Sequence, residues 1–532
     1  MSLRTHCCHV AIAFALTIAI TASTQGPDIT EFQKFTSLPP VAQAHFGNAV
    51  AIDNDILVVG AKDDDSGAVH AGAVYLYRFV DGQWQFDLQL LPSDIEDFQM
   101  FGFSVAIDGD VIVVGSKRED EHLDKGGTIV DIGAVYVFRF NGESWLEEAR
   151  LIASDFFIFD ELGSAIDLEG NRILVGAHQE GTACDDDPNH NIQKNCRSGA
   201  AYVFEYDGVK WTETTKIVPP DTHVGDRFGS AVDLQGDVAV IGSWNSGNTA
   251  GPCPPNCATD GHGAAYIYRF DGTTWSLETK LVPPGGGEPF DYMGFSISLD
   301  GDRLIVGDEG DNEFEVSGGA AFVYEYHPKD PDLWVFQQKL VSSDLQFGDF
   351  LGRSVTLEGD IAVVGADFKE VGGFNGAGSA YVFTYDGKLW TEQVKLVPSD
   401  PEAFALFSFR ALLNDGRLIL PAIATDEGKA QNAGSAYYFA GVSDCNNNAT
   451  LDLIDIIEGD STDRNNNGIP DECEGPQCPW DLDNSGSVGA SDLLALLATW
   501  GPCKGCPADF DENGAVGASD LLALLANWGP CP

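Results

Sequence analysis

The segment FGFSVAIDGDVIVVGSK (101–117), followed by GAVYVFRFNGESW (133–145), decides the fold, because the chain repeats it. An earlier copy reads FGNAVAIDNDILVVGAK (46–62), and a more divergent last copy runs over 407–441. Further copies begin at Leu162, Phe228, Met293 and Leu351. The spacing between copies varies from 55 to 66 residues. Self-similarity with such a period predicts a repeat architecture of seven units.

Each copy contains four short runs rich in Val, Ile, Tyr and Phe, separated by Asp-Gly or Asn-Gly turns. This pattern is typical of antiparallel strands joined by hairpins. Four strands repeated seven times predict an all-β fold, a seven-bladed β-propeller over residues 25–441.

The seventh copy ends at 441 without the tryptophan-bearing strand of the other copies. The N-terminal segment EFQKFTSLPP (31–40) is similar to the outer-strand segment FQQKLVSSD (336–344). We therefore expect residues 31–40 to supply the missing strand. The N-terminal strand would close the ring and leave no exposed sheet edge.

The FG, GD and VGA landmarks of the repeat resemble the FG-GAP family, which forms propellers in integrin α-chain heads and in exported bacterial proteins. The resemblance covers about residues 31–441 and implies the same fold. In that family some blades carry a calcium loop between the second and third strands. The corresponding segments here are KDDDSG (62–67), REDEHLDKGG (118–127) and DEGDNE (308–313). They are acidic but out of register with the family pattern, so calcium and a solvated turn remain alternatives.

The net charge of −53 excludes nucleic acids and anionic lipid surfaces as partners and favours cations. The chain contains no GxSxG, HExxH, phosphate-loop or dinucleotide motif. The repeated Asp residues 94, 155, 221, 344 and 400 share one position of the repeat, which favours a role in turns. No catalytic residue is predicted.

Residues 1–24 are typical of a signal peptide, with an apolar run from Val10 to Ile20. That run is too short to span a bilayer, and no other stretch comes close. We expect a protein without a transmembrane segment that is secreted to the extracellular space or the cell surface.

Ten cysteines follow the signal, and an even number in an exported chain favours disulfides. Their proximity in sequence suggests the pairs Cys184–Cys196, Cys253–Cys257, Cys445–Cys473, Cys478–Cys503 and Cys506–Cys531. Spacing alone leaves the connectivity open. Zinc is disfavoured, because no CxxC pair is matched by a second pair or by spaced histidines.

Two long loops, 178–199 and 243–263, break the repeat and are expected on one face of the propeller. Long ordered loops on a rigid scaffold are common binding sites. The candidates for contact with an extracellular glycan or protein are Trp244, Asp185, Asp186, Asp187 and His190. The alternative is an insertion that binds no ligand.

Beyond residue 441 the composition changes to Asp, Asn and Cys. Calcium loops place oxygen ligands at positions 1, 3, 5, 7, 9 and 12. The segment 463–474 fulfils this with Asp463, Asn465, Asn467, Ile469, Asp471 and Glu474. The segment 444–455 is a weaker match, with Asp444, Asn446, Asn448, Asp452 and Asp455. We expect Ca²⁺ in both, within a separate calcium-loop segment over 442–475.

Two further loops precede short apolar helices at a period of 28 residues. The loop 481–492 offers Asp481, Asp483, Ser485, Ser487 and Asp492 as calcium ligands. The loop 509–520 offers Asp509, Asp511, Asn513, Ala515 and Asp520. Calcium and cross-links are expected to stabilise this segment, because so small a unit buries little apolar surface.

Residues 476–532 resemble dockerins, specifically the GPC-flanked type at the ends of exported planctomycete proteins. Dockerins are duplicated calcium loop–helix modules that bind cohesins. The resemblance implies a cohesin-like partner, or another surface protein, at loop positions 10 and 11. Those positions are Ala490, Ser491, Ala518 and Ser519.

The sequence as a whole predicts a secreted calcium-binding propeller that mediates protein or carbohydrate recognition and is anchored by its dockerin-like tail. The alternatives are a polysaccharide-degrading hydrolase or lyase carried on a dockerin, and a purely structural surface component. Paired, buried, non-repeating carboxylates in the propeller funnel would favour the enzyme.

Overall fold

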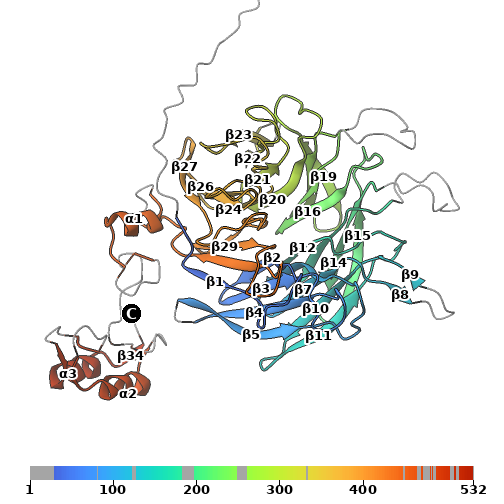
Figure 1. Ribbon diagram of the computed structural model, residues 1–532. Helices are drawn as coiled ribbons and strands as arrows, with labels where there is room; N and C mark the ends of the chain where they lie inside the picture. The colour runs from blue at the N-terminus through green and yellow to red at the C-terminus, as the bar shows by residue number, and fades with distance from the viewer. Residues whose placement is uncertain are drawn as a thin grey trace, which may run out of the picture.

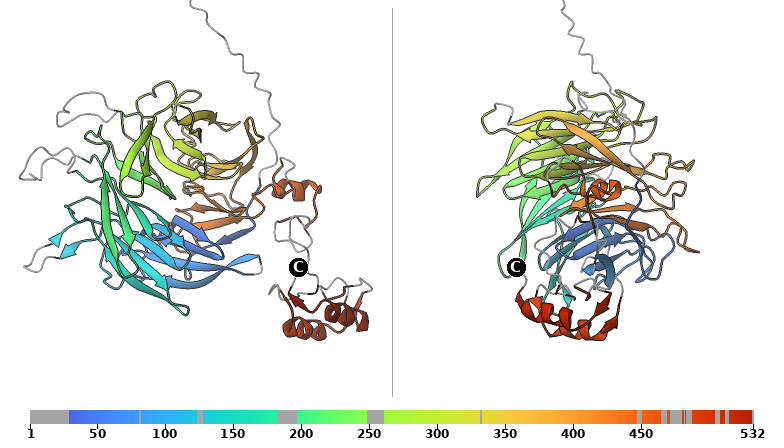
Figure 2. Two further views of the ribbon diagram at one scale, coloured as in Figure 1. Left: turned by 180° about the vertical axis from the view of Figure 1, so that it is seen from behind. Right: turned by 90° about the vertical axis from the view of Figure 1, so that its left-hand side faces the viewer.

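The structure is a computed structural model of the chain, which describes residues 29–80, 82–122, 128–181, 197–247, 261–330, 333–446, 450–463, 469–470, 480, 482, 487–503, 508–510 and 514–530. Seven four-stranded antiparallel sheets occupy most of this part of the chain. Figures 1 and 2 show the sheets arranged around a common axis. The predicted seven-bladed propeller is confirmed.

The first strand of each blade lies innermost and the fourth outermost. Blades one to three consist of β2 (Phe46–Asp53), β3 (Ile56–Ala61), β4 (Ala73–Val80), β5 (Gln83–Leu90); β6 (Phe101–Asp108), β7 (Val111–Ser116), β10 (Ala134–Phe140), β11 (Trp145–Leu151); and β12 (Ala165–Glu169), β13 (Arg172–Ala177), β14 (Ala200–Tyr206), β15 (Trp211–Ile217). Blades four to six consist of β16 (Phe228–Gln235), β17 (Val238–Ser243), β18 (Ala264–Phe270), β19 (Trp275–Leu281); β20 (Met293–Asp300), β21 (Arg303–Asp308), β22 (Ala320–Tyr326), β23 (Trp334–Leu340); and β24 (Ser354–Glu358), β25 (Ile361–Ala366), β26 (Ser379–Tyr385), β27 (Trp390–Leu396). A two-residue ribbon, β8 (Glu121–His122) with β9 (Thr128–Ile129), extends from blade two.

The seventh blade combines the two ends of the propeller. Its strands are β28 (Leu412–Asn414), β29 (Arg417–Ala422), β30 (Ser435–Phe439) and the N-terminal β1 (Gln33–Phe35). Figure 1 shows blue β1 on the orange sheet, and the register pairs Lys34 with Tyr437. The side chain of Glu31 accepts hydrogen bonds from the backbone and hydroxyl of Ser399. Glu147 does the same for Ser93. The N-terminal strand is therefore equivalent to an ordinary fourth strand, as predicted.

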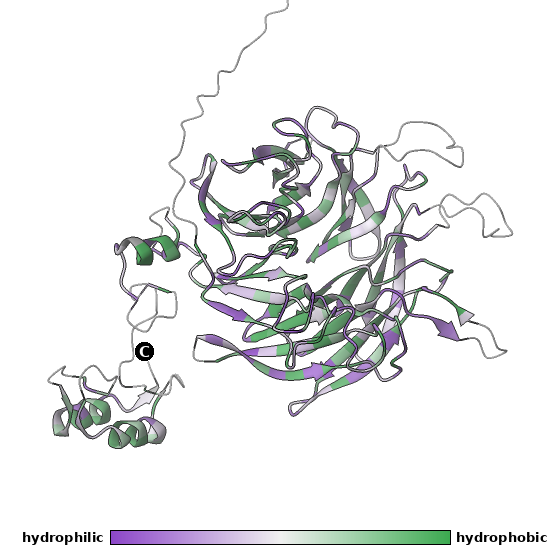
Figure 3. Ribbon diagram, in the orientation of Figure 1, coloured by the Kyte–Doolittle hydropathy of each residue, from purple (hydrophilic) through white to green (hydrophobic). Residues whose placement is uncertain are grey.

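Apolar side chains fill the spaces between neighbouring sheets. Figure 3 shows hydrophobic residues along the strands of the propeller. Each of the main clusters joins strands of adjacent blades, as where Phe101 and Tyr136 of blade two pack with Val74 of blade one. Because both faces of every sheet are covered in this way, the second and third strands are buried along most of their length.

Side-chain oxygens at the ends of the inner strands, carboxylates in all cases but Gln235, connect one blade to the next. The backbone amide of Gly109 donates to Asp53 at 2.8 Å, and Gly236 donates likewise to Glu169 of the preceding blade. Corresponding bonds link Gly170 to Asp108, Gly301 to Gln235, Gly359 to Asp300, and Asp415 to Glu358. These hydrogen bonds fix the angle between blades, because each turn amide donates to a specific side chain of the preceding blade instead of to water.

The topology gives the propeller two unlike faces. One face, called the linker face, carries the linkers from a fourth strand to the next first strand and the loops between second and third strands. The other, called the turn face, carries only short turns such as 108–111 and 140–145. The long segments 178–199 and 243–263 follow second strands, so both begin and end on the linker face.

Beyond blade seven, α1 (Asp452–Glu458) packs Leu453 and Ile454 against that blade. The last segment contains α2 (Ala490–Ala498) and α3 (Ala518–Ala526), with β31 (Ser487–Val488) paired to β34 (Gly529–Pro530) and β32 (Gly501–Pro502) paired to β33 (Ala515–Val516). Leu496 and Leu524 are the buried centre of this small unit. No helix in the described part of the chain is long and apolar enough to span a membrane.

Candidate binding face

Four linkers present an exposed phenylalanine at the same place, three residues before the repeat's FG position. Phe98, Phe159, Phe290 and Phe404 are 41% to 60% exposed. All four have φ between 61° and 73°, the left-handed region that bulky residues rarely adopt. Gly225 and Gly348 take this position in two other linkers, also with positive φ. The backbone thus requires a glycine-like conformation, and four blades nevertheless place a large apolar side chain there.

Backbone hydrogen bonds hold these phenylalanines in place. The amide of Phe98 donates to the carbonyl of Val69, and that of Phe404 donates to Asn375, each in the loop of the preceding blade. Phe159 and Phe290 are bonded in the same way to Val130 and Gly261. The four exposed phenyl groups therefore lie on an ordered surface. We call this set of four linker residues around the propeller axis, Phe98, Phe159, Phe290 and Phe404, the phenylalanine ring.

Beneath the linker face, a Tyr–Asp–cation group recurs at the blade junctions. Asp155 accepts a hydrogen bond from the Tyr202 hydroxyl at 2.9 Å and pairs with Lys216 at 2.7 Å. Although burial opposes it, Lys216 holds the pKa of Asp155 below its usual value. The same group forms at Asp94, Asp221, Asp344 and Asp400. The repeated aspartates therefore connect blades, which agrees with the structural role inferred from their repetition.

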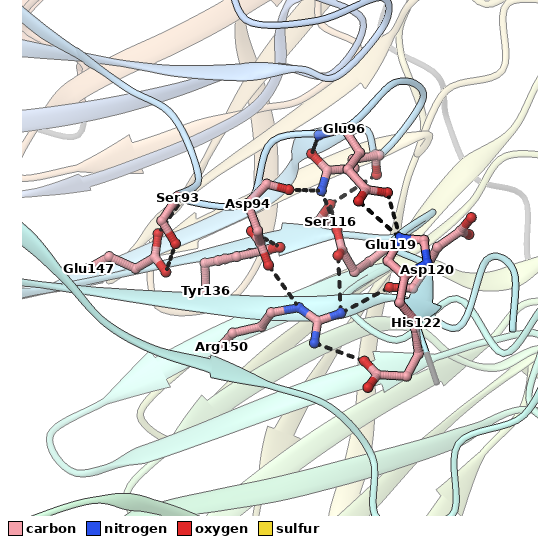
Figure 4. Close-up of polar contacts among 12 residues, drawn as sticks. Ser93, Asp94, Glu96, Ser116, Glu119, Asp120, His122, Tyr136, Glu147 and Arg150 are labelled. Carbon is pink, nitrogen blue, oxygen red and sulfur yellow. Dashed lines mark hydrogen bonds and ion pairs between the residues drawn. The ribbon is translucent and has the colours of Figure 1, made fainter. Parts of the chain in front are cut away.

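Figure 4 shows this group at the junction of blades one and two. Arg150 lies 3.0 Å from Glu119, 3.0 Å from Glu121 and 3.5 Å from Asp94. Burial, with the charge of Asp94, raises the pKa of Glu119 to about 7 even though Arg150 opposes the rise. The arginine is thus fully surrounded by carboxylates, an arrangement suited to structure and not to ligand binding.

Most described carboxylates of the three acidic segments considered as propeller calcium loops have partners within the chain, as Glu119 and Glu121 have in Arg150. Both carboxylate oxygens of Asp308 are buried without a hydrogen-bond partner among the described residues. Asp64 accepts hydrogen bonds from Ser66 and Tyr75, and Asp311 pairs through both oxygens with Lys339 at 2.8 Å. Asp308 is fully buried, and burial raises its pKa well above the usual value. In the described residues no group of three or more His, Cys, Asp or Glu side chains has the geometry of a metal site. The contacts favour structural turns over calcium loops in the propeller.

An axial channel of about 330 Å³ runs between the seven inner strands. Asp167 and Asp233 from consecutive blades line it, at a position where the other blades have Ala, Ser, Thr or Leu. Burial raises the pKa of Asp233 to about 7 and that of Asp167 well above its usual value.

Each of these carboxylates also bridges two blades. Asp167 accepts from the Leu234 amide at 2.6 Å, and Asp233 accepts from Leu299 at 2.9 Å. In the following blades the hydroxyls of Ser298 and Thr356 accept the corresponding hydrogen bonds from the amides of Leu357 and Leu413. Aspartate occurs at this position in two blades only, but the inter-blade hydrogen bond that it accepts recurs at Ser298 and Thr356. The recurrence of the bond favours a structural function for the two aspartates.

Of the predicted contact residues, the structure describes Trp244. Its half-buried ring meets Tyr292 edge-on at 5.3 Å, and Arg227 lies over it at 5.9 Å. Asp185, Asp186, Asp187 and His190 lie outside the described residues. Sequence reasoning missed the phenylalanine ring, although the recurrence of Phe three residues before FG is visible in four linkers.

In the tail, the first and last ligand positions of the loop 509–520 converge. Asp509 accepts from the Gly514 amide and Asp520 from the Phe510 amide, both at 2.8 Å, and both carboxylates are buried. Asp492 takes the same helix-capping position as Asp520. Buried carboxylates that converge on one loop fit a calcium site. Ser487 and Ala515 lie in the short strands beside these loops.

The remaining predicted ligands are only partly described. Asp452 accepts hydrogen bonds from Ser443 and Cys445, and Asp455 accepts one from Asn446 at 3.0 Å, so the described ends of the segment 444–455 meet at these two carboxylates. Asp444, Asp463 and Ile469 are described residues. Outside the described residues lie Asn448, Asn465, Asn467, Asp471, Glu474, Asp481, Asp483, Ser485, Asp511 and Asn513.

The predicted partner residues Ala490, Ser491, Ala518 and Ser519 begin the two tail helices and are exposed. Further along the helices an apolar surface follows that the sequence reasoning did not single out. Its exposed residues are Leu494, Leu497, Trp500, Leu522, Leu525 and Trp528. Of the ten predicted disulfide cysteines only Cys445 and Cys503 are described, so the pairing stays a prediction.

The fold is a β-propeller whose linker face carries exposed apolar side chains. Six stretches match the family described as FG-GAP repeat, over residues 29–77, 84–138, 145–204, 211–268, 275–324 and 334–383. They cover more than half of the chain, which therefore belongs to the FG-GAP repeat family. Five of them begin at an outer-strand tryptophan and end in the third strand of the next blade, so the sequence unit spans two sheets. A comparison with curated proteins finds no match.

Proposed function

We propose that this protein is a secreted calcium-binding propeller that recognises a protein or carbohydrate at the cell surface through its linker face. The family and the fold suggest a recognition or binding role. The observation that carries the proposal is the phenylalanine ring, four exposed side chains at equivalent positions of one face.

These phenylalanines contribute little to folding and carry a cost. Each sits in a left-handed backbone, which costs a residue with a Cβ roughly 1–2 kcal/mol. Each side chain is 41% to 60% exposed, so its buried part offsets some of this cost while a large apolar area stays in contact with solvent. Exposed apolar groups gathered on one face of a soluble domain mark interaction sites. Binding to a partner accounts for both the conformation and the exposure.

The tail is proposed to anchor or assemble the protein. Buried carboxylates at both ends of the loop 509–520 support calcium binding, and the exposed leucines and tryptophans of α2 and α3 offer an apolar contact surface. A cohesin-like or other surface protein is the proposed partner of this segment, by analogy with dockerins.

A variant with Asn at Phe98, Phe159, Phe290 and Phe404 tests the recognition face. Asn tolerates the left-handed backbone, so this variant should fold and melt at or above the wild-type temperature. We expect it to lose binding to the ligands that the wild type captures on a glycan array or from a panel of purified surface proteins. The matched control places Asn at the exposed turn-face positions Val80, Leu146, Val209 and Leu389. Equal binding by all three proteins would refute the assignment of the linker face.

The second candidate is a polysaccharide-degrading hydrolase or lyase, which the Asp167–Asp233 pair in the axial channel favours. Asp167→Asn and Asp233→Asn keep an oxygen for the inter-blade bonds but cannot exchange protons. Release of reducing ends by the wild type and its loss in the folded variants would establish this candidate. Glycan binding without product release would support the recognition protein.

A further inference from the structure

A cluster of cationic side chains lies on the linker face at the mouth of the axial channel, between blades two, three and four. Lys117 follows β7, His178 follows β13, Arg197 precedes β14 and Arg227 precedes β16. The charges of Lys117, Arg197 and Arg227 all act on the His178 imidazole and, together with its burial, lower its pKa well below the usual value. We call these four residues the cationic cluster.

Two carboxylates of the described residues face the cluster, Glu161 and Asp131, and the charge of Lys117 acts on both. Glu161 lies 3.1 Å from Lys117 and 3.7 Å from His178. Lys117 also experiences the charges of Arg118 and Lys62, and Lys62 has its own partner in Asp63. Lys117 and Arg227 both experience the charge of Glu161. Among the described residues the three permanent cations of the cluster outnumber these two carboxylates, in a protein of net charge −53.

Arg197 and Arg227 lie next to each other and are joined by a backbone hydrogen bond. The backbone amide of Arg227 donates to the carbonyl of Arg197 at 3.3 Å. Within the described ranges neither arginine forms an ion pair, whereas Arg150 has three carboxylates around it. Burial, with the charge of Arg197, lowers the pKa of Arg227 to about 10. Arg227 is half-buried and Arg197 is exposed, so the two like charges meet at the edge of the solvent, where a bound anion would relieve their repulsion.

Aromatic rings surround the cluster. The Arg227 guanidinium lies over the Trp244 ring at 5.9 Å, and Trp244 meets Tyr292 at 5.3 Å. The Lys117 ammonium lies 4.2 Å from the centre of the Phe103 ring. Trp244 and Tyr292 are half-buried and leave part of each ring accessible at the mouth. Rigid aromatic faces beside cations match a ligand with both a flat apolar face and a negative charge.

The channel is also lined with small polar residues on this side. Ser164 and Ser230 take the position that Phe103 and Phe295 take in blades two and five. Ser164 lies under the cluster, since its hydroxyl accepts from the backbone amide of His178 at 3.5 Å. The channel wall beside the cations therefore combines the Ser164 hydroxyl with the Phe103 ring, which lies against Lys117.

We propose that the cationic cluster binds the carboxylate or sulfate group of an acidic saccharide, with Trp244 and Tyr292 against the sugar ring. Arg197 and Arg227 contact the anionic oxygens, for which a guanidinium has matching donor geometry. This inference rests on the proposed recognition function and names the chemical class of its ligand. The overall negative charge does not prevent binding, because it acts weakly beyond about 8 Å at physiological ionic strength.

The test measures binding of the full mature chain to four polymers at about 0.15 M salt. Polygalacturonate carries carboxylates, carrageenan carries sulfates, dextran is a neutral saccharide and poly-glutamate is an anion without sugar rings. The variant is Arg197→Gln with Arg227→Gln. The matched control is Arg78→Gln with Arg139→Gln, which removes two arginines paired with Asp87 and Glu148 on other parts of the surface.

We expect the wild type to bind polygalacturonate or carrageenan, and which of the two it binds identifies the anionic group. The Arg197/Arg227 variant should bind at least about tenfold more weakly, the equivalent of one charge-assisted hydrogen bond. The control should bind like the wild type, and all three should share one melting temperature.

Other results would overturn the inference. Poly-glutamate bound as tightly as the acidic glycans would assign the cluster to acidic peptides. Equal binding by variant and wild type, or no binding to any acidic glycan, would remove the cluster from recognition. The proposed function survives these outcomes if the wild type still captures a ligand that the Asn variant of the phenylalanine ring does not, so the two failures are distinguishable.

Discussion

Gly60 lies where the inner strand of the next blade crosses it. A Cβ at this residue would stand 2.1 Å from the carbonyl oxygen of Gly102. The same contact recurs between Gly176 and Gly229 at 2.0 Å, and between Gly307 and Gly352 at 1.9 Å. The two glycine landmarks of the repeat are therefore partners across the blade interface. This explains why the FG and VG glycines occur together.

Gly60→Ala is expected to destabilise the propeller by about 1–3 kcal/mol, as overpacking in a tightly fitted interface does. Gly109→Ala is the control, because its Cβ would enter open space and meet only the strain of φ +56°. That strain costs about 1 kcal/mol. Urea unfolding followed by circular dichroism measures both. A loss at residue 60 no larger than at residue 109 would contradict the close-approach explanation.

A second prediction for single residues concerns how the contribution of Asp233 to folding stability depends on pH. Its pKa is raised to about 7 by burial, so between the usual carboxyl pKa and 7 the folded state holds a proton that the unfolded state releases. Its contribution to stability is therefore greatest at low pH and falls as the pH rises through 7. Asp233→Asn keeps the acceptor for Leu299 and removes the titration.

The variant should gain melting temperature relative to the wild type as the pH rises from 5 to 8. Asp155→Asn should instead cost a constant amount of stability between pH 5 and 8 and cost less only below about pH 4, because Lys216 and Tyr202 hold the pKa of Asp155 below its usual value. Asp155 stabilises above its unfolded pKa, so its replacement costs stability at pH 7 and matters less in acid. Parallel pH profiles for the two variants would contradict the assigned environments.

At the scale of elements, β1 determines whether the propeller is a ring. It pairs with β30 only over Gln33–Phe35, but Lys34 also pairs with Asp400 and Glu427. Phe35 contributes to the cluster between blades seven and one. A strand of three residues can therefore keep the ring closed, because ion pairs of Lys34 and apolar contacts of Phe35 add to the backbone pairing with β30.

Removing residues 29–37 from the mature chain is expected to expose the edge of β30. The shortened protein should melt at a lower temperature, be cleaved faster by proteases and associate through its open edge. A chain that starts at Ile29 is the control, and it should behave like the mature protein. Unchanged melting and a monomeric profile in size-exclusion chromatography after removal of 29–37 would contradict closure by this strand.

At the scale of the whole molecule, two segments draw their stability from different sources. The propeller is stabilised by apolar contacts between sheets and by polar joints from blade to blade. The tail has a small apolar centre at Leu496 and Leu524, with buried carboxylates beside it. A unit of that size needs metal or cross-links to fold stably.

Removal of calcium with a chelator should unfold the tail and leave the propeller intact. The far-ultraviolet β-signal is expected to persist, while proteolysis sites appear between residues 442 and 532. Adding calcium back should restore protection. A tail equally protected with and without chelator would contradict the calcium loops, and simultaneous loss of the β-signal would mean that calcium also holds the propeller.

The fold was predictable from the sequence because the repeat displays the same strands and turns seven times. Ring closure was predictable because EFQKF retains the pattern of an outer strand. The spacing of the candidate calcium loops in the tail is also visible in the local sequence, and calcium binding there stays a prediction. In each case the signal lies in neighbouring residues, where local geometry limits which side chains can occupy a position.

The candidate binding face was only partly predictable. Trp244 was identified from the length of its loop, but Arg197, Arg227 and Lys117 carry no local signal. They belong to three different blades and meet only because the ring brings the linkers and loops to one mouth. In the same way Asp167 and Asp233, 66 residues apart, become neighbours in the channel.

The sequence by itself determined the propeller, the number of blades and the strand that closes it, since each follows from contacts within a repeat or between repeats of one pattern. Only the tertiary structure decided which residues form a surface. It turned four spaced phenylalanines into a ring and three spaced cations into a cluster. Circular closure places equivalent positions at one height around an axis, and side chains distant in sequence then share one electrostatic and apolar environment.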